Sequence, residues 1–276
     1  MKGIETRHIR IPVGKRKMKA LVLMPKERSE ALSTGVLWLH GGGFALGCKE
    51  QVYYSRAMAL VRSKNCVVLV PDYRLSWFHP YPAALEDAYA ALLYLRDHCD
   101  EWGIRPDQLV VMGCSAGGGL TAALGMLARD KKEVAIAFQL PLYPMLDNEP
   151  TETSKDNHGR FTNTRNLRLA WRLYLRGDKD KAASPYAVPA RQTDYKDLPP
   201  TYTFVGKYEA FYSETKSFVE QLRAADVPVE MDVYETGLHS FDQFQPKSTI
   251  ARQAAERLEE YFEKAQRLYF AEQSKA

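Results

Sequence analysis

The sequence predicts an α/β fold, in which a mostly parallel eight-stranded sheet is covered by helices on both faces. Short, continuously apolar segments alternate with helix-forming segments along most of the chain, a pattern typical of parallel strands buried on both sides. Glycine-rich turns follow two of the apolar segments. With 276 residues, of which 45% are apolar, the chain is long enough for one large domain over residues 1–276 but short for two.

Eight segments have the pattern of strands. Residues 5–11 and 18–24 alternate between apolar and polar side chains, so we expect an antiparallel hairpin that turns at Gly14. The other six predicted strands are residues 35–39, 66–70, 109–112, 135–140, 201–206 and 229–234. Helices are predicted over residues 53–64, 82–101, 118–124, 164–176, 213–225 and 248–266. In such a sheet, ligands bind beyond the carboxyl ends of the strands.

Composition narrows the classes of function. The first thirty residues hold nine Lys or Arg and three Glu, a balance of +6 against −2 for the rest. We expect the basic run 15–19 to be a solvated hairpin tip and not a nucleic-acid patch. No stretch approaches the roughly 20 apolar residues of a membrane span, and the first residues lack a signal-peptide pattern, so a cytoplasmic protein without a membrane partner is expected. The four cysteines lack metal-ligand spacing and are expected to be reduced, and neither a metal nor a cofactor is expected.

Ser115 is the candidate nucleophile. It lies in the motif Gly-Cys-Ser-Ala-Gly at residues 113–117, between a predicted strand and a helix-forming segment. A serine on so sharp a turn needs neighbours without side chains two positions before and two positions after it, and both are glycine.

A second glycine-rich turn follows the predicted strand 35–39. His40 is followed there by three glycines, which include Gly42 and Gly43. Consecutive glycines let the backbone N–H groups approach a substrate oxygen, which is the task of a loop that supplies half of an oxyanion hole.

The loops after the last two predicted strands hold an acid and a base. Glu209 follows residues 201–206, and His239 follows residues 229–234. Asp232 and Asp242 compete with Glu209 for the role of the acid, but Asp232 is in mid-strand, and Asp242 is too near His239 in sequence to reach its far ring nitrogen easily. The order serine, acid, histidine is that of one class of serine hydrolases.

Residues 147–189 interrupt the alternation of strands and helices. The segment is polar and charged, and it contains one amphipathic helix, 164–176. We interpret it as a small cap or lid insertion over the carboxyl ends of the strands. An ordinary surface excursion is the alternative interpretation.

Five motifs together resemble the bacterial hormone-sensitive-lipase-like esterases. They are His-Gly-Gly-Gly-Phe at 40–44, Pro-Asp-Tyr-Arg-Leu at 71–75, Tyr-Pro-Ala-Ala-Leu-Glu-Asp at 81–87, Gly-Cys-Ser-Ala-Gly-Gly at 113–118 and Leu-Pro-Pro-Thr at 198–201. The resemblance spans residues 35–244 and implies an α/β-hydrolase fold and cofactor-free hydrolysis of carboxylic esters. It implies that Ser115 is the nucleophile, that His239 is the base, and that the oxyanion donors are Gly42, Gly43 and Ala116.

The chain departs from the family pattern in three places. Cys114 and Glu209 stand where the family usually has aspartate. Members often carry a helical cap before the glycine motif, whereas the thirty-nine residues before His40 have the pattern of strands, so the pocket cover is expected from residues 147–189.

The expected reaction is hydrolysis of a small-molecule ester, with an acetyl to butyryl acyl group, through a Ser-His-Glu triad and an acyl-enzyme. An amidase or formamidase of the same fold, or a non-catalytic hydrolase-like receptor, remains an alternative. The exposed last strand offers a surface for a homodimer. Five aromatic residues are candidates for a shallow pocket or for ordinary core: Phe44, Trp77, Trp171, Tyr208 and Phe211.

Overall fold

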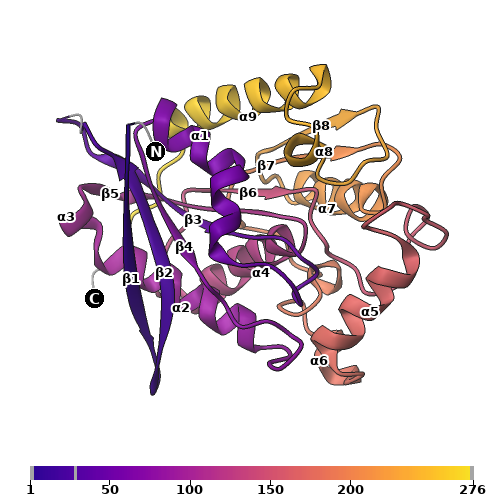
Figure 1. The fold of residues 1–276 in the computed structure, drawn as a ribbon. Coiled ribbons are helices and arrows are strands. Elements are labelled where there is room, and N and C mark those ends of the chain that lie inside the picture. Colours follow the sequence, from indigo (N-terminus) through magenta and orange to yellow (C-terminus); the bar gives the residue numbers. More distant parts are fainter. Residues whose placement is uncertain (1–2, 28–29, 274–276) are drawn as a thin grey trace.

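An eight-stranded sheet organises the residues that the computed structural model describes, 3–27 and 30–273 (Figure 1). The strands lie side by side in the order β1-β2-β4-β3-β5-β6-β7-β8. Their bounds are β1 (Ile4–Val13), β2 (Arg16–Pro25), β3 (Ser33–Leu39), β4 (Cys66–Pro71), β5 (Ile104–Cys114), β6 (Phe138–Leu142), β7 (Thr201–Gly206) and β8 (Val229–Tyr234). β2 pairs antiparallel with β1 on one side and with β4 on the other, and all other pairs are parallel. The predicted α/β class and its mostly parallel eight-stranded sheet are confirmed.

Helices cover both faces of the sheet. Side chains alternate along the buried strands, so Leu37 and Leu39 face one side while Val36 and Trp38 face the other. The helical elements are η1 (Lys49–Tyr54), α1 (Arg56–Ser63), α2 (Ala83–Asp97), α3 (Cys99–Trp102), α4 (Ala116–Lys131), α5 (Thr164–Leu175), α6 (Lys179–Ala183), η2 (Pro189–Arg191), α7 (Tyr212–Ala224), α8 (Phe241–Phe244) and α9 (Thr249–Leu268). α1 and α9 cover one face, and α2, α4 and α7 cover the other (Figure 1).

Most of the predicted elements have somewhat different bounds in the structure, among them two helices and one strand whose ends differ for a local reason. The helix expected from residue 53 begins at Arg56, after a 3-10 turn, and the helix expected over 82–101 is divided into α2 and α3. The strand expected over 135–140 begins at Phe138 and continues through Pro141. Pro141 has no N–H to donate toward β7, and the backbone bonds from Gln139 to Pro200 and from Tyr143 to Phe204 hold the two strands together on either side of it.

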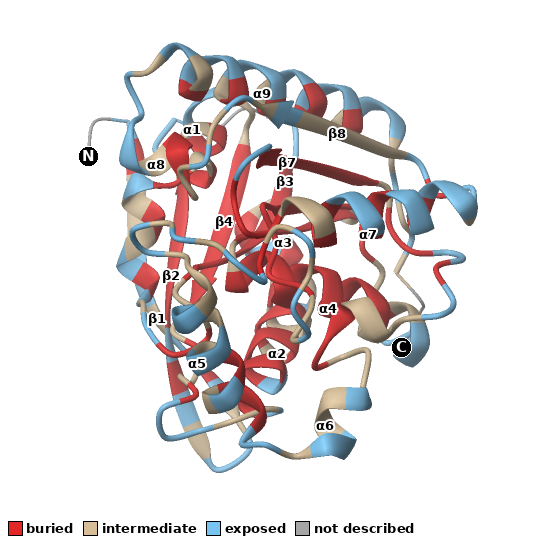
Figure 2. Cartoon of the chain, turned by 90° about the vertical axis from the view of Figure 1, so that its right-hand side faces the viewer, coloured by how far each residue is buried: buried red, intermediate tan, exposed pale blue. Residues whose placement is uncertain are grey.

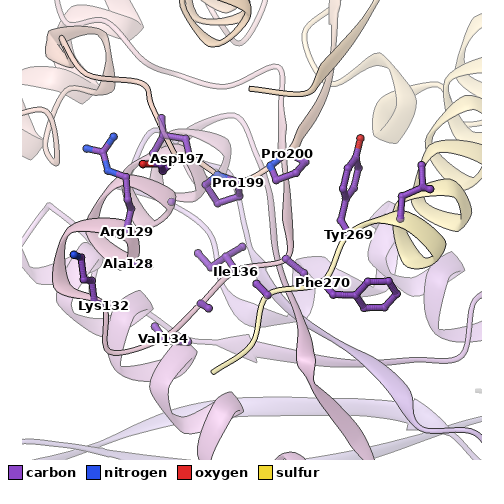
Figure 3. A pocket seen from close by; sticks show the side chains of 16 residues that line it. Ala128, Arg129, Lys132, Val134, Ile136, Asp197, Pro199, Pro200, Tyr269 and Phe270 are labelled. Carbon is purple, nitrogen blue, oxygen red and sulfur yellow. The ribbon is translucent and has the colours of Figure 1, made fainter. Parts of the chain in front are cut away.

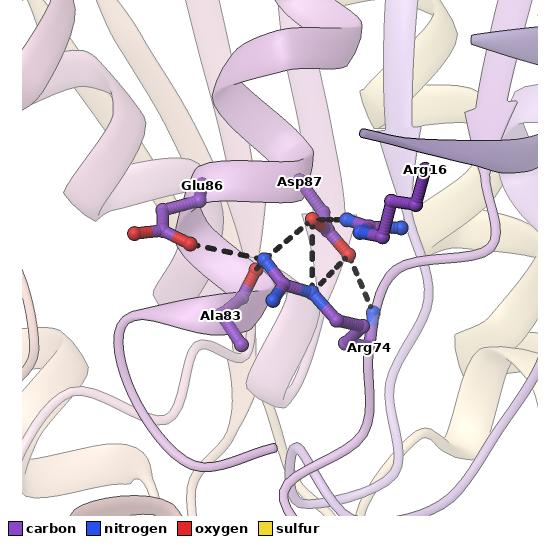
Figure 4. A network of polar contacts seen from close by, with 5 residues as sticks. All are labelled: Arg16, Arg74, Ala83, Glu86 and Asp87. Atoms are coloured by element: carbon purple, nitrogen blue, oxygen red, sulfur yellow. Dashed lines mark hydrogen bonds and ion pairs between the residues drawn. The ribbon is translucent and has the colours of Figure 1, made fainter. Parts of the chain in front are cut away.

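A buried carboxylate ties the hairpin β1–β2 to the body of the fold (Figure 4). Asp87 of α2 has a fully buried side chain and pairs with Arg16 of β2 and with Arg74, which follows β4. The backbone N–H of Arg74 also donates to Asp87 over 2.9 Å. Glu86 pairs with Arg74 at the exposed rim of this network.

The two ends of the sheet differ in what covers them. At the amino-terminal ends of β6 and β7, a hollow of about 480 Å³ lies between the end of α4 and the segment after α9 (Figure 3). At the carboxyl ends, the segment with α5 and α6 covers part of the sheet (Figure 1).

Along the sheet, burial decreases toward β8, which is an edge strand and only partly buried (Figure 2). Among the described residues, no helix has the length and apolarity needed to cross a membrane.

Candidate active site

Ser115 lies on a strained turn between β5 and α4. Its backbone has φ 57° and ψ −121°, a conformation that residues with side chains rarely adopt. A β-carbon on Gly113 would lie 2.3 Å from the carbonyl oxygen of Gly117, and one on Gly117 would lie 2.2 Å from that of Leu39. Only glycine fits at these two positions, as the motif predicted. The turn leaves Ser115 partly exposed beyond the carboxyl end of β5.

His239 and Glu209 join Ser115 in one chain of polar contacts. The Nε2 atom of His239 lies 2.9 Å from Oγ of Ser115, and its Nδ1 atom contacts Oε2 of Glu209. The other carboxylate oxygen, Oε1, accepts a hydrogen bond of 2.8 Å from the backbone N–H of Gly206. Glu209 is 1% exposed, so water does not compete for these bonds. The fold thus brings the three predicted residues together from the loops after β5, β7 and β8.

The two competing carboxylates are engaged elsewhere. Asp232 in β8 accepts a hydrogen bond of 2.8 Å from the hydroxyl of Tyr202. Asp242 in α8 is buried and accepts a hydrogen bond of 3.2 Å from Nε of Arg56. Burial raises the pKa of Asp242, and the charge of Arg56 acts against this shift. Within the described residues, neither carboxylate contacts His239.

Two aromatic rings pack edge-on against the His239 imidazole. The ring centroids of Tyr143 and Phe211 lie 5.1 and 4.9 Å from that of His239. The hydroxyl of Tyr143 accepts a hydrogen bond of 2.8 Å from Nε2 of Gln243. Sequence reasoning missed Tyr143, although its place directly after the buried strand β6 is the signal that marked the other site residues. Together the two rings restrict the orientation of the imidazole.

The glycine turn after β3 runs beside the nucleophile. A β-carbon on Gly41 would lie 3.3 Å from Cβ of Ser115. Gly42 and Gly43 have φ of 121° and 60°, which glycine adopts without steric cost. In the described part of the chain, the backbone N–H groups of Gly42, Gly43 and Ala116 donate to no protein acceptor. These donors are therefore free to bind a ligand oxygen.

The buried side chains of His40, Tyr73 and Cys114, next to the glycine turn and Ser115, are uncharged. The buried imidazole of His40 stacks on Tyr73 with centroids 4.1 Å apart, and the Tyr73 hydroxyl donates to the carbonyl of His40 over 2.8 Å. Burial lowers the pKa of His40 to about 4. Burial also raises the pKa of Cys114 to about 11, so this residue is an uncharged thiol. The side chain that contacts Oγ of Ser115 is that of His239, which in turn contacts Glu209.

The segment 147–189 reaches the glycine turn through α5. A β-carbon on Gly43 would lie 3.1 Å from Cβ of Ala170 in α5. The rings of Trp171 and Tyr174 pack against Phe44, with centroids 5.5 and 4.0 Å from it. Of the five aromatic candidates, Phe44, Trp171 and Phe211 are buried, whereas Trp77 and Tyr208 are 47% and 59% exposed.

Comparison with known proteins assigns the family. A sequence model of the α/β-hydrolase fold matches residues 36–243, about three quarters of the chain. This chain belongs to the α/β-hydrolase fold family. The match confirms the hormone-sensitive-lipase-like group that the motifs indicated.

Several relatives of this α/β hydrolase are esterases by name. The esterase LipI of Mycobacterium tuberculosis is 32% identical over 209 residues, which are 75% of this chain and 65% of LipI. The acetyl esterase of Salmonella paratyphi A is 28% identical over 258 residues, 91% of this chain and 78% of the relative. The solved structure of a bacterial heroin esterase superposes with a TM-score of 0.89 at 30% identity, over 96% of this chain and 85% of that one. The chain spans 60 to 66% of the length of the first four curated relatives that it matches.

Proposed function

We propose that this α/β hydrolase is a serine carboxylic ester hydrolase that acts on small esters with short acyl groups, from acetyl to butyryl. The observation that carries the proposal is the contact chain from Ser115 through His239 to Glu209, beside three unengaged backbone donors. The names of its relatives support ester hydrolysis.

The proposed reaction has two acyl-transfer steps. Oγ of Ser115 attacks the ester carbonyl carbon while Nε2 of His239 takes the hydroxyl proton. The N–H groups of Gly42, Gly43 and Ala116 bind the oxyanion, and Glu209 stabilises the charged imidazole. The tetrahedral intermediate collapses, His239 passes the proton to the departing alcohol, and an acyl-Ser115 ester remains. Water, deprotonated by His239, then attacks this ester, and Ser115 regains its proton as the carboxylic acid leaves.

We also propose that residues 147–189 form the cap over the acyl site. α5 supports this role, because its Ala170 lies against Gly43 and its Trp171 packs on Phe44. These rings fill the space beneath α5 with buried side chains, which favours a short acyl group.

A serine-directed organophosphate tests the nucleophile. It should add one label to the intact protein and abolish hydrolysis of p-nitrophenyl butyrate, and Ser115→Ala should take no label and lose about 10⁶-fold in kcat. Labelling that persists in Ser115→Ala would overturn the proposal. The unlabelled wild-type protein, given an ester and its isosteric amide, should hydrolyse the ester faster. Faster hydrolysis of the amide would make the protein an amidase.

A further inference from the structure

A basic hollow lies on the outer side of the proposed cap. It has a volume of about 850 Å³ and is bounded by residues 155–158 and by the side of α5. The side chain of Thr164 holds these walls together, because its Oγ1 donates to the carbonyl of Ser154 over 2.7 Å and accepts from the N–H of Asn157 over 2.8 Å. A β-bridge between His158 and Asn163 adds a second link. The hollow is therefore part of a locally hydrogen-bonded structure and not a gap beside a loose loop.

Four cations line the hollow without a partner. Within the described part of the chain, none of them has an ion pair or a side-chain hydrogen bond, and all four are exposed: Lys155, Arg165, Arg168 and Arg172. Among the described lining residues, Asp156 is the one carboxylate, and it pairs with His158 over 3.0 Å. The lining therefore carries a clear excess of positive charge.

The three arginines share one face of α5. Their spacing of three and then four residues places them side by side on the helix, where like charges repel and destabilise it. Ala170, which abuts Gly43, lies roughly 140–160° around the helix from each of them. The width of a helix, about 10 Å, thus separates the hollow from the glycine turn.

We propose that this hollow binds a compact polyanion with three or more negative charges, such as a chain of phosphates or a tricarboxylate. Such a ligand would neutralise the mutual repulsion of the arginines and accept their forked N–H groups in pairs. The volume is that of a small-molecule site, which spans roughly 300–1,000 Å³. The described lining offers no aromatic side chain beyond the imidazole of His158 on which a base would stack, so the recognised chemistry is the cluster of anionic oxygens.

Calorimetric titration of the full chain with tripolyphosphate and, separately, with citrate tests this site at about 150 mM salt. One saturable site per chain is expected. The double variant Arg168→Gln/Arg172→Gln should weaken binding about tenfold, because two of the four lining cations are lost. The matched control is Arg62→Gln/Arg252→Gln, which removes the same charge from two exposed arginines on α1 and α9 that form no ion pair with any residue the structure describes. It should change the affinity less than twofold.

The result decides the proposal without reference to ester hydrolysis. Binding of both anions supports recognition of any clustered anionic oxygens, and binding of tripolyphosphate alone supports a phosphate-bearing ligand. The proposal is wrong if neither anion binds saturably. It is also wrong if Arg168→Gln/Arg172→Gln binds the anions as tightly as the wild type does, or if the control Arg62→Gln/Arg252→Gln weakens binding to the same extent.

Discussion

Glu209 reaches His239 with a side chain one methylene longer than that of aspartate, and the loop after β7 accommodates this length. Its Oε1 accepts from the N–H of Gly206, three residues earlier, which turns Oε2 toward Nδ1 of His239. The carboxylate is buried, so its interaction with the imidazole is weakly screened. A longer acid is therefore compatible with a well-oriented histidine.

Glu209→Gln tests the role of this carboxylate as the triad acid. The amide keeps the shape of the side chain but removes the charge that stabilises the imidazolium, so kcat for p-nitrophenyl butyrate should fall by roughly 10⁴. Asp232→Asn is the control, because Asp232 bonds Tyr202 and not His239, and it should stay near wild type. Loss of activity in Asp232→Asn together with near wild-type activity in Glu209→Gln would show that Asp232, and not Glu209, is the triad acid.

At the scale of elements, one carboxylate connects β2, the loop after β4 and α2. Asp87 has no exposed side-chain surface, whereas its partners Arg74 and Arg16 are 26% and 35% exposed. The partly exposed arginines are able to rehydrate when the carboxylate is removed. The cost of breaking this network is then smaller than for a pair that is buried on both sides.

Asp87→Asn should lower the free energy of unfolding by about 2 kcal/mol, below the roughly 3–5 kcal/mol of a fully buried pair. Urea unfolding at neutral pH measures this change. Glu86→Gln offers a matched control on the same helix, because Glu86 is exposed, and it should cost less than about 1 kcal/mol. Equal losses in the two variants would contradict the network.

The packing of α5 on Phe44 predicts the acyl preference. Each methylene gains about 0.8 kcal/mol only where apolar walls exclude water, and the rings of Phe44, Trp171 and Tyr174 are already packed on one another. Across p-nitrophenyl esters of two to sixteen carbons, kcat/KM should therefore peak at two to four carbons. A maximum at eight or more carbons would mean that the cap encloses an acyl tunnel.

At the scale of the whole molecule, two buried groups set opposite pH dependences of stability. Burial lowers the pKa of His40 from 6.5 to about 4, so the unfolded chain takes up this proton first as the pH falls. The contribution of the neutral imidazole to the free energy of unfolding is therefore complete above pH 6.5 and is lost as the pH falls toward 4. Burial raises the pKa of Glu214 well above 4.5, and its Oε1 accepts from the N–H of Leu146 over 2.7 Å. The unfolded chain releases the Glu214 proton first, so this contribution is complete below pH 4.5 and is lost as the pH rises.

The free energy of unfolding of the wild type should therefore rise less between pH 4.5 and 6.5 than that of a variant in which residue 214 does not titrate, because Glu214 opposes the gain from His40 as the pH rises. Glu214→Gln keeps the acceptor for Leu146 but does not titrate. Its stability should rise by about 3 kcal/mol from pH 4 to 6.5 and then level off. Urea midpoints across this range measure both profiles, and identical profiles would contradict the assignment to Glu214.

The order of elements and the candidate site residues follow from the sequence itself. Apolar runs such as those of β3 and β5 predict buried strands because their side chains need cover on both faces, and the glycines at 113 and 117 mark the turn because the backbone packs too closely there for a β-carbon. Glu209 and His239 were predicted because each follows directly after one of the last two strands, at the edge of the sheet where Ser115 also lies.

Only the tertiary structure decided which side chains touch. The pairing of Asp242 with Arg56 joins residues 186 positions apart, and the contact of Tyr143 with His239 depends on how β6 and β8 are placed in the sheet. The same holds for Phe44 and Trp171, for which the sequence left pocket and core equally open, and which packing between α5 and the glycine turn places in the core. Sequence patterns report the environment of each segment, whereas contacts between distant segments arise only when the chain is folded.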